Sequence, residues 1–191
     1  KDLIIERVTL NGNTPAEYKL SENDSILGQA LAILLQPGVS QVTITYKTSP
    51  GAEALQWLSK EQTAGKTQPF LFTQSQAILA RSWVPCQDSP GIRFTYNATV
   101  RVPANLLALM SAANPKEKNP EGVYHFEMNQ PIPSYLLALA VGDITYKPIS
   151  NRSGIYAEPA LIDTATWEFA DLEKMIAGAE ELYGKYQWEQ Y

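Results

Sequence analysis

The run from Ile92 to Val102 alternates apolar and polar side chains over eleven residues and most constrains the fold. Apolar side chains at even positions from 94 to 102 share one face, and polar side chains at odd positions from 93 to 101 share the other, until Pro103 ends the run. Successive side chains of a β-strand point to opposite faces, so this pattern predicts a strand with one buried face.

Further strands are predicted along the chain. The segment 3–10 is β-branched and leads into Asn11-Gly12, a strong hairpin signal. Segments 41–46, 70–73 and 124–128 also read as strands, and the continuously apolar segment 135–141 reads as a strand covered on both faces. Residues 51–69 read as a loop in which Trp57 is a buried anchor, and residues 114–122 as a polar loop. The expected fold class is mainly β.

The last part of the chain has a different period. Between Phe169 and Tyr183, apolar residues recur at helical spacing, with Thr166 as the expected N-cap and Gly184 as the C-cap glycine. The period changes near residue 160. We therefore expect two parts, a β domain over residues 1–150 and a linker with one helix over residues 151–191.

Composition excludes several classes of function. The formal net charge is -5 and no cluster of Lys or Arg is present, which argues against nucleic acid as a partner. No segment has the roughly 18 apolar residues of a membrane span, so no membrane partner is expected. His125 is the only histidine and Cys86 the only cysteine, so the chain cannot form a two-histidine zinc site or an internal disulfide.

Gln74 and Gln76 are the candidate binding residues. They follow the strand at 70–73 and, on an extended chain, project to the same side. Their amide oxygens could jointly accept hydrogen bonds from an ammonium group. Polar side chains in such positions more often simply bond to backbone or water, so this alternative stays open at this point.

Other polar residues are given structural interpretations. Asp88 could be an acid or base, but an Asp before Ser-Pro more often bonds nearby backbone amides. Cys86 is interpreted as a small buried hydrophobe and His125 as a half-exposed strand residue. The pair Glu180-Glu181 is interpreted as part of a solvated helical face.

A family resemblance covers essentially the whole chain. Residues 71–77, Arg81 and the segment 85–90 resemble the T-Q-x-[EQ]…A-R…P-C-x-D-x-P signature of the zinc aminopeptidases of the aminopeptidase N and leukotriene A-four hydrolase type. The leukotriene A-four hydrolase branch is indicated by the segments 54–58, 61–66, 106–112 and 131–136.

The resemblance implies a saddle-like, mostly antiparallel β domain and a C-terminal helix that opens a thermolysin-like catalytic domain. It also implies a slice of a longer enzyme that removes N-terminal residues from peptides, with the zinc held by the missing catalytic domain. Neither the G-x-M-E-N nor the H-E-x-x-H motif of the family occurs here, so we expect this chain alone to bind no zinc and to be inactive, with no catalytic or metal-binding residue of its own.

By the same resemblance, Gln76 contacts the amino group of the peptide substrate and Gln74 lines the same pocket, while the β domain caps the cleft. Most aminopeptidases have Glu at the position of Gln76. A carboxylate pairs with an ammonium group by charge, whereas an amide offers it only a dipole. The negative charge would therefore come from elsewhere, from the Glu of the missing motif. Two alternatives remain, a non-catalytic scaffold with the same β architecture and a free-standing β-sandwich binding domain.

Overall fold

The computed structural model describes all 191 residues and is mostly antiparallel β, with two α-helices at the C-terminal end. The expected mainly β fold class is confirmed. The chain divides into two compact units, each built from segments that are separate in sequence. The first comprises residues 1–55, 74–93 and 133–136, and the second comprises residues 56–73, 94–132 and 137–191.

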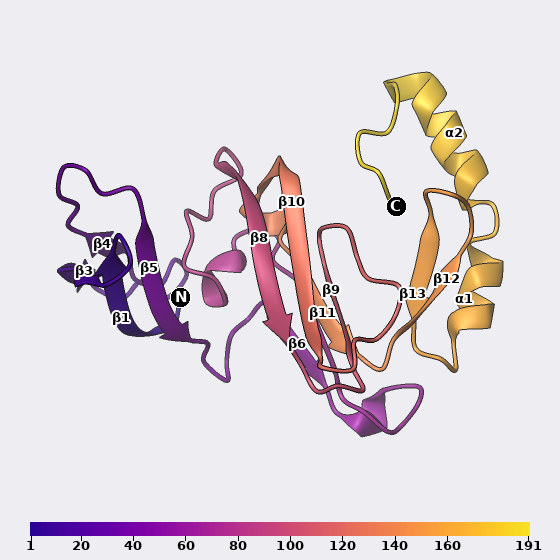
Figure 1. Ribbon diagram of the computed structural model, residues 1–191, viewed down its shortest axis with the longest axis horizontal. Coiled ribbons are helices and arrows are strands. Elements are labelled where there is room, and N and C mark those ends of the chain that lie inside the picture. Colours follow the sequence, from indigo (N-terminus) through magenta and orange to yellow (C-terminus); the bar gives the residue numbers. More distant parts are fainter. The chain divides into compact units, whose positions relative to one another are not determined.

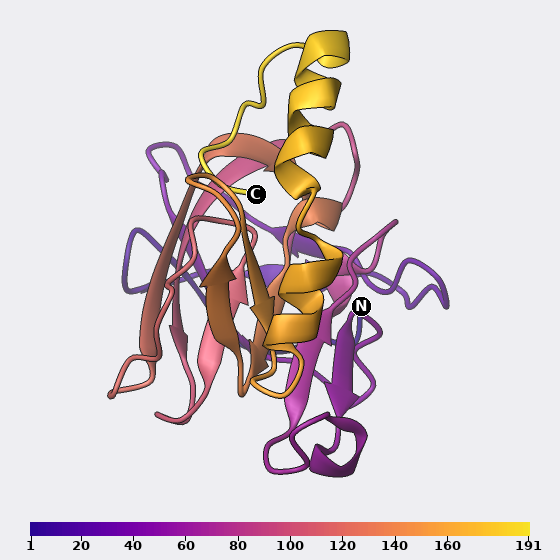
Figure 2. The same cartoon turned by 90° about the vertical axis from the view of Figure 1, so that its right-hand side faces the viewer.

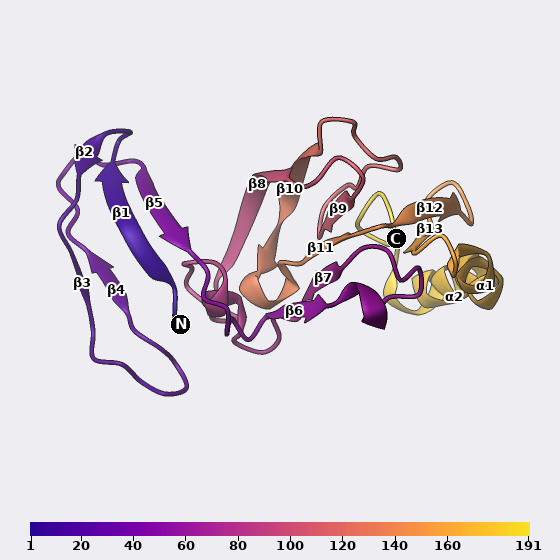
Figure 3. The same ribbon diagram turned by 90° about the horizontal axis from the view of Figure 1, so that it is seen from below.

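Two antiparallel groups of strands form most of the first unit (Figure 3). One is a three-stranded sheet in the order β2-β1-β5, made of Thr14–Pro15, Ile4–Leu10 and Val42–Lys47. The other pairs β3 (Tyr18–Leu20) with β4 (Leu31–Ile33). The predicted hairpin at Asn11-Gly12 is confirmed, because Leu10 pairs with Thr14 across a turn in which Gly12 has a φ of 99°.

The remaining segments of the first unit are short turns that carry the candidate site. They include the 3-10 helices η2 (Ala80–Ser82) and η3 (Ser134–Leu136). Ala54, Ala80 and Trp83 are buried there, at 0%, 0% and 9% exposure. The small alanines allow close approach of backbone segments, which the hydrogen bonds described below require.

The second unit contains a four-stranded sheet and a two-stranded ribbon (Figure 1). The sheet has the order β6-β7-β11-β9, made of Leu55–Leu58, Phe70–Thr73, Leu139–Gly142 and Leu107–Met110. The ribbon pairs β8 (Arg93–Arg101) with β10 (Val123–Pro133). Even-numbered residues of β8 are half-buried and odd-numbered residues exposed, as the alternation predicts.

The core of this unit lies on the inner faces of these strands. Leu107 and Ala108 of β9 are fully buried, and Tyr124 and Phe126 of β10 are each 3% exposed. The Tyr124 hydroxyl donates to the Leu106 carbonyl oxygen at 2.8 Å, which satisfies its buried polar group. Burial of each such large side chain contributes about 1.5–3 kcal/mol.

Two helices and a hairpin complete the second unit (Figure 2). The hairpin pairs β12 (Thr145–Pro148) with β13 (Gly154–Ala157), and α1 (Ile162–Glu168) packs against it. The second helix, α2 (Leu172–Tyr183), buries Leu172 and Ile176. Gly184 follows α2 with a φ of 87°, so the predicted C-cap is confirmed.

The helix start differs from the prediction. Thr166 lies inside α1, where its hydroxyl donates to the Ile162 carbonyl oxygen at 2.6 Å, and Asp171 holds the N-cap position of α2. The predicted single helix is therefore two, separated at residues 169–171. Neither helix is long and apolar enough to cross a membrane.

Two further predictions are wrong. The segment 51–69 contains β6 and the 3-10 helix η1 (Lys60–Gln62), and Trp57 is 63% exposed because it lies in β6 at the edge of the sheet. The apolar segment 135–141 is only partly strand, since η3 precedes β11. An apolar run alone does not distinguish a strand from a 3-10 turn, and Leu136 in this turn is 47% exposed.

Candidate functional site

Gln74 and Gln76 lie in the turn directly after β7, in the first unit. Both side chains are exposed, whereas Ser75 between them is 3% exposed. Exposure therefore alternates at these three positions. The Gln74 Oε1 accepts a hydrogen bond from the Gln76 backbone N–H at 3.2 Å. A carbonyl oxygen has two lone pairs, so Oε1 keeps capacity for a second donor.

Hydrogen bonds hold the backbone of this turn at its start. The Gln74 N–H donates to the Ala54 carbonyl oxygen at 2.9 Å. The buried Ser75 hydroxyl accepts from Trp83 Nε1 at 3.1 Å, and the Ser75 carbonyl oxygen accepts from the Leu79 N–H at 2.9 Å. The side chain between the two glutamines is thus directed inward. The peptide bond between Gln76 and Ala77 is cis.

The end of the turn is held by η2. The Ser82 hydroxyl donates to the Leu79 carbonyl oxygen at 2.7 Å and accepts from the Ala54 N–H at 3.0 Å. Ala54 therefore contacts both the start and the end of the segment 74–82. Both ends of the turn are anchored on the same residue.

Asp88 is a buried carboxylate beside this turn. Its side chain is 1% exposed, and its Oδ2 accepts from the Arg81 backbone N–H at 3.0 Å and from Arg81 Nε at 3.1 Å. Its Oδ1 accepts from the Ser134 hydroxyl at 2.5 Å. The interpretation of Asp88 as an acceptor of nearby backbone amides is confirmed, but the sequence did not reveal Arg81 Nε and Ser134 as further partners.

Cys86 and His125 have no geometry that indicates catalysis. Cys86 is half-buried, and burial raises the pKa of its thiol to about 11, with the Asp88 charge adding to the effect. A thiol of that pKa is almost entirely protonated at neutral pH. His125 is an exposed residue of β10 whose Nδ1 contacts the Thr99 hydroxyl at 3.1 Å.

A cavity of about 630 Å³ lies within the first unit. Apolar and polar residues line it together. The charged residues of the lining are Lys1, Asp2, Glu22, Asp24, Arg81 and Asp88. Gln74 and Gln76 do not line it. The predicted amine-binding residues therefore stand on an exposed turn and not inside this cavity.

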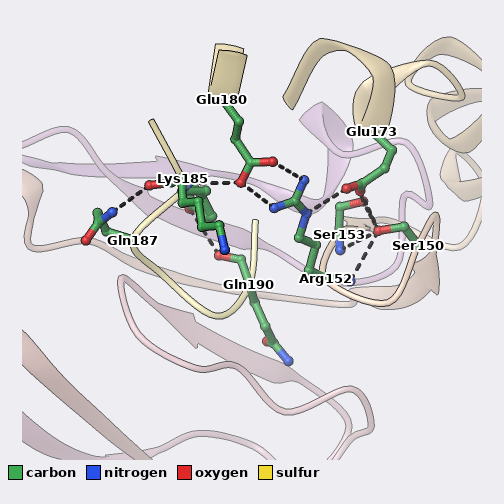
Figure 4. Close-up of polar contacts among 9 residues, drawn as sticks. Ser150, Arg152, Ser153, Glu173, Glu180, Lys185, Gln187 and Gln190 are labelled. Carbon is green, nitrogen blue, oxygen red and sulfur yellow. Dashed lines mark hydrogen bonds and ion pairs between the residues drawn. The ribbon is translucent and has the colours of Figure 1, made fainter. Parts of the chain in front are cut away.

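In the second unit, polar side chains gather around Arg152 (Figure 4). The guanidinium contacts Glu173 Oε1 through Nε at 2.6 Å and both carboxylate oxygens of Glu180 at 2.7 and 2.9 Å. The Ser150 and Ser153 hydroxyls also donate to Glu173 Oε2, at 2.6 and 3.2 Å. We call these five residues the Arg152 cluster.

The Arg152 cluster corrects the interpretation of Glu180. This residue is half-buried and ion-paired, and only its neighbour Glu181 is exposed on the helix surface. The hydrogen bonds from Arg152 and the Tyr186 backbone lower the pKa of Glu180 to about 2. Nothing in the local sequence indicated this pairing, because Arg152 is 28 residues away.

The described residues do not provide a zinc site. No group of three or more His, Cys, Asp or Glu side chains is placed to hold a metal ion. The clustered carboxylates of Glu173 and Glu180 are occupied by Arg152 and two serines.

Comparisons agree with this architecture. Residues 2–136 match the Peptidase M1 N-terminal domain, and the chain therefore belongs to that family, the N-terminal domains of zinc aminopeptidases. The yeast LTA4 hydrolase structure superposes with a TM-score of 0.91 and 34% identity over 100% of this chain and 30% of that chain. An M1 zinc metallopeptidase from Deinococcus radiodurans shares the fold, with a TM-score of 0.72 at 19% identity over 99% of this chain and 45% of that one.

Three curated relatives match most of the chain. Leukotriene A-4 hydrolase of Xenopus laevis is 44% identical over 100% of this chain and 33% of the relative. Leucine aminopeptidase 2 of Yarrowia lipolytica is 40% identical over 99% of this chain and 29% of the relative, and human aminopeptidase B is 43% identical over 79% and 23%. The chain thus spans about a third of the length of the first two relatives.

Proposed function

We propose that this chain is the N-terminal part of a zinc-dependent aminopeptidase and that Gln74 and Gln76 bind the free amino group of its peptide substrate. The exposed turn that carries both side chains supports this role most directly. Membership of the M1 family supports the peptidase activity of the whole enzyme.

Hydrogen bonding gives the two glutamines a means of selecting peptide amino termini. An ammonium group has three donors, and each amide oxygen is an acceptor. Capture of the amine fixes where the peptide lies, so that only its first peptide bond reaches the reacting groups. A blocked amine would lose these bonds and leave amides unpaired, at about 1–3 kcal/mol each where the site is closed to water.

The exposed apolar side chains of the two helices support a further domain as partner. Trp167, Met175, Leu182 and Tyr183 are 64–86% exposed. Large apolar side chains left exposed on two consecutive helices are typical of a surface that another structure covers. We assign this surface to the catalytic domain of the whole enzyme, which would also hold the zinc, and we expect the 191 residues alone to be inactive.

Steady-state kinetics of the whole enzyme test the role of Gln76. Gln76→Ala should lower kcat/KM for a peptide with a free amino terminus more than tenfold, because about 1.4 kcal/mol of binding corresponds to a factor of ten. Gln41→Ala is a matched control, since Gln41 is an exposed glutamine of the same unit away from the turn. Unchanged kinetics for Gln76→Ala would reject the proposed contact.

A second variant separates amine recognition from a general loss of packing. Gln76→Glu places a negatively charged carboxylate next to the proposed position of the substrate ammonium group. It should therefore lower KM for free-amine peptides. The same substitution should not improve binding of a matched peptide whose amino terminus is blocked by acetylation. Equal effects on both peptides would show that position 76 does not face the amine.

A further inference from the structure

Asp88 connects its own segment to η2, seven residues earlier, and to η3, 46 residues later. Its carboxylate receives hydrogen bonds from Arg81 in η2 and from Ser134 in η3, and its own carbonyl oxygen accepts from Arg81 Nη2 at 2.8 Å. Arg81 contributes its backbone N–H as well as its side chain. The Asp88 carboxylate therefore fixes the position of the backbone at Arg81.

The hydrogen bonds between Arg81 and Asp88 add to the contacts that fix the turn that carries Gln76. The Ala54 backbone is hydrogen-bonded to residues 74 and 82, and the Trp83 side chain is hydrogen-bonded to the Ser75 hydroxyl. Arg81 lies five residues after Gln76. Its backbone N–H is hydrogen-bonded to Asp88, which lies at the other end of the turn 83–88. A buried, fully paired carboxylate keeps one geometry, since any shift would leave its charge uncompensated.

We propose that Asp88, together with Arg81 and Ser134, is a positioning residue for amine recognition. It fixes the backbone from which Gln76 projects and does not itself touch the substrate. A displacement of a binding group by about 1 Å can lower activity by roughly 10²-fold. This inference rests on the proposed role of Gln76 and names the residues on which that role depends.

Substitutions in the whole enzyme separate positioning from general stability. Asp88→Asn keeps the size of the side chain and removes its charge. We expect it to raise KM for a free-amine peptide about tenfold or more, with a smaller change in kcat. In the background of Gln76→Ala, the same substitution should change KM by less than about twofold, because the contact that it positions is already absent.

Ser134→Ala gives a milder variant should Asp88→Asn fail to fold. It removes one hydrogen bond to Oδ1, and we expect a rise in KM of about threefold that again disappears in the Gln76→Ala background. Thr9→Ala is the matched control, since Thr9 is a buried hydroxyl of the same unit that donates one hydrogen bond, to the Gly12 carbonyl oxygen at 2.9 Å. It should leave KM unchanged.

The outcomes distinguish two failures. If Gln76→Ala leaves both kcat and KM unchanged, the proposed function fails and the positioning role fails with it. If Gln76→Ala raises KM but the folded Asp88 and Ser134 variants do not, only the positioning role is overturned. Equal effects of Asp88→Asn with and without Gln76 would likewise overturn it, because they would show a purely structural role.

Discussion

Arg152 and Glu180 form a two-point ion pair, in which Nη1 and Nη2 contact Oε1 and Oε2 at 2.7 and 2.9 Å. Two parallel hydrogen bonds fix the orientation of both groups, which a single contact would not do. Arg152 lies between β12 and β13, and Glu180 lies in α2. The pair therefore connects the hairpin to the C-terminal helix.

The ion pair predicts a pH dependence of stability. The pKa of Glu180 is lowered from 4.5 to about 2 in the folded chain. At pH values between these two, the unfolded state binds more protons, so stability rises with pH. The contribution is fully present above about pH 5 and is lost as the pH falls towards 2. Glu173 acts in the same direction, since bonds from Ser150 and Arg152 lower its pKa.

Thermal unfolding of the wild type and of Arg152→Gln checks the direction of this pH dependence. The difference in Tm should be largest above about pH 5 and should shrink as the pH falls to 2. Arg101→Gln, which changes an exposed arginine of β8, serves as the control for the change in net charge. A Tm difference that grew at low pH would contradict the assigned ion pairs.

Local patterns predicted the strands of this fold better than its contacts. The alternation at 92–102 predicted β8 and its half-buried face, because the period of a strand is visible in one segment. The Asp88–Ser134 and Arg152–Glu180 contacts join residues 46 and 28 positions apart. Such pairings depend on how segments meet, which no local pattern contains.

The errors have similar causes. Trp57 was predicted to be buried from its chemistry, but its exposure is set by its place in an edge strand. Thr166 has the chemistry of an N-cap, but its hydroxyl bonds back to Ile162 inside α1. The strands β3, β4, β12 and β13 were not predicted, since runs of three or four residues have little periodicity. Gln74 and Gln76 were predicted to share a side, and their role in binding stays a prediction.

Gly122 should not tolerate a side chain. It has a φ of 67°, and a Cβ built there would lie 1.9 Å from the Val102 carbonyl oxygen. The Val102 N–H donates to the Gly122 carbonyl oxygen at 2.8 Å, so the two segments cannot separate without losing that bond. Gly122→Ala should cost more than the roughly 1–2 kcal/mol of the left-handed conformation alone.

Gly12→Ala is the matched control for this substitution. Gly12 also has a positive φ, of 99°, but a Cβ there meets nothing within 4 Å. Urea unfolding should therefore show a larger loss of stability for Gly122→Ala than for Gly12→Ala. Equal losses would mean that the close approach to Val102 carries no cost.

Cys86 should react slowly with thiol reagents. With a pKa of about 11 in place of 9.0, its thiolate fraction at neutral pH falls by about 10²-fold. The rate of alkylation should rise about tenfold for each pH unit up to pH 10. A rate that levelled off near pH 9 would show that burial and the Asp88 charge do not raise the pKa.

A structure of the whole enzyme with a bound, uncleaved peptide tests the central claim most directly. The measured quantity is the distance from the peptide amino nitrogen to Gln76 Oε1. We predict about 2.7–3.2 Å, the length of an N–H···O hydrogen bond, with Gln74 lining the same pocket. A peptide bound with its amino nitrogen out of hydrogen-bonding reach of both glutamines would contradict the account.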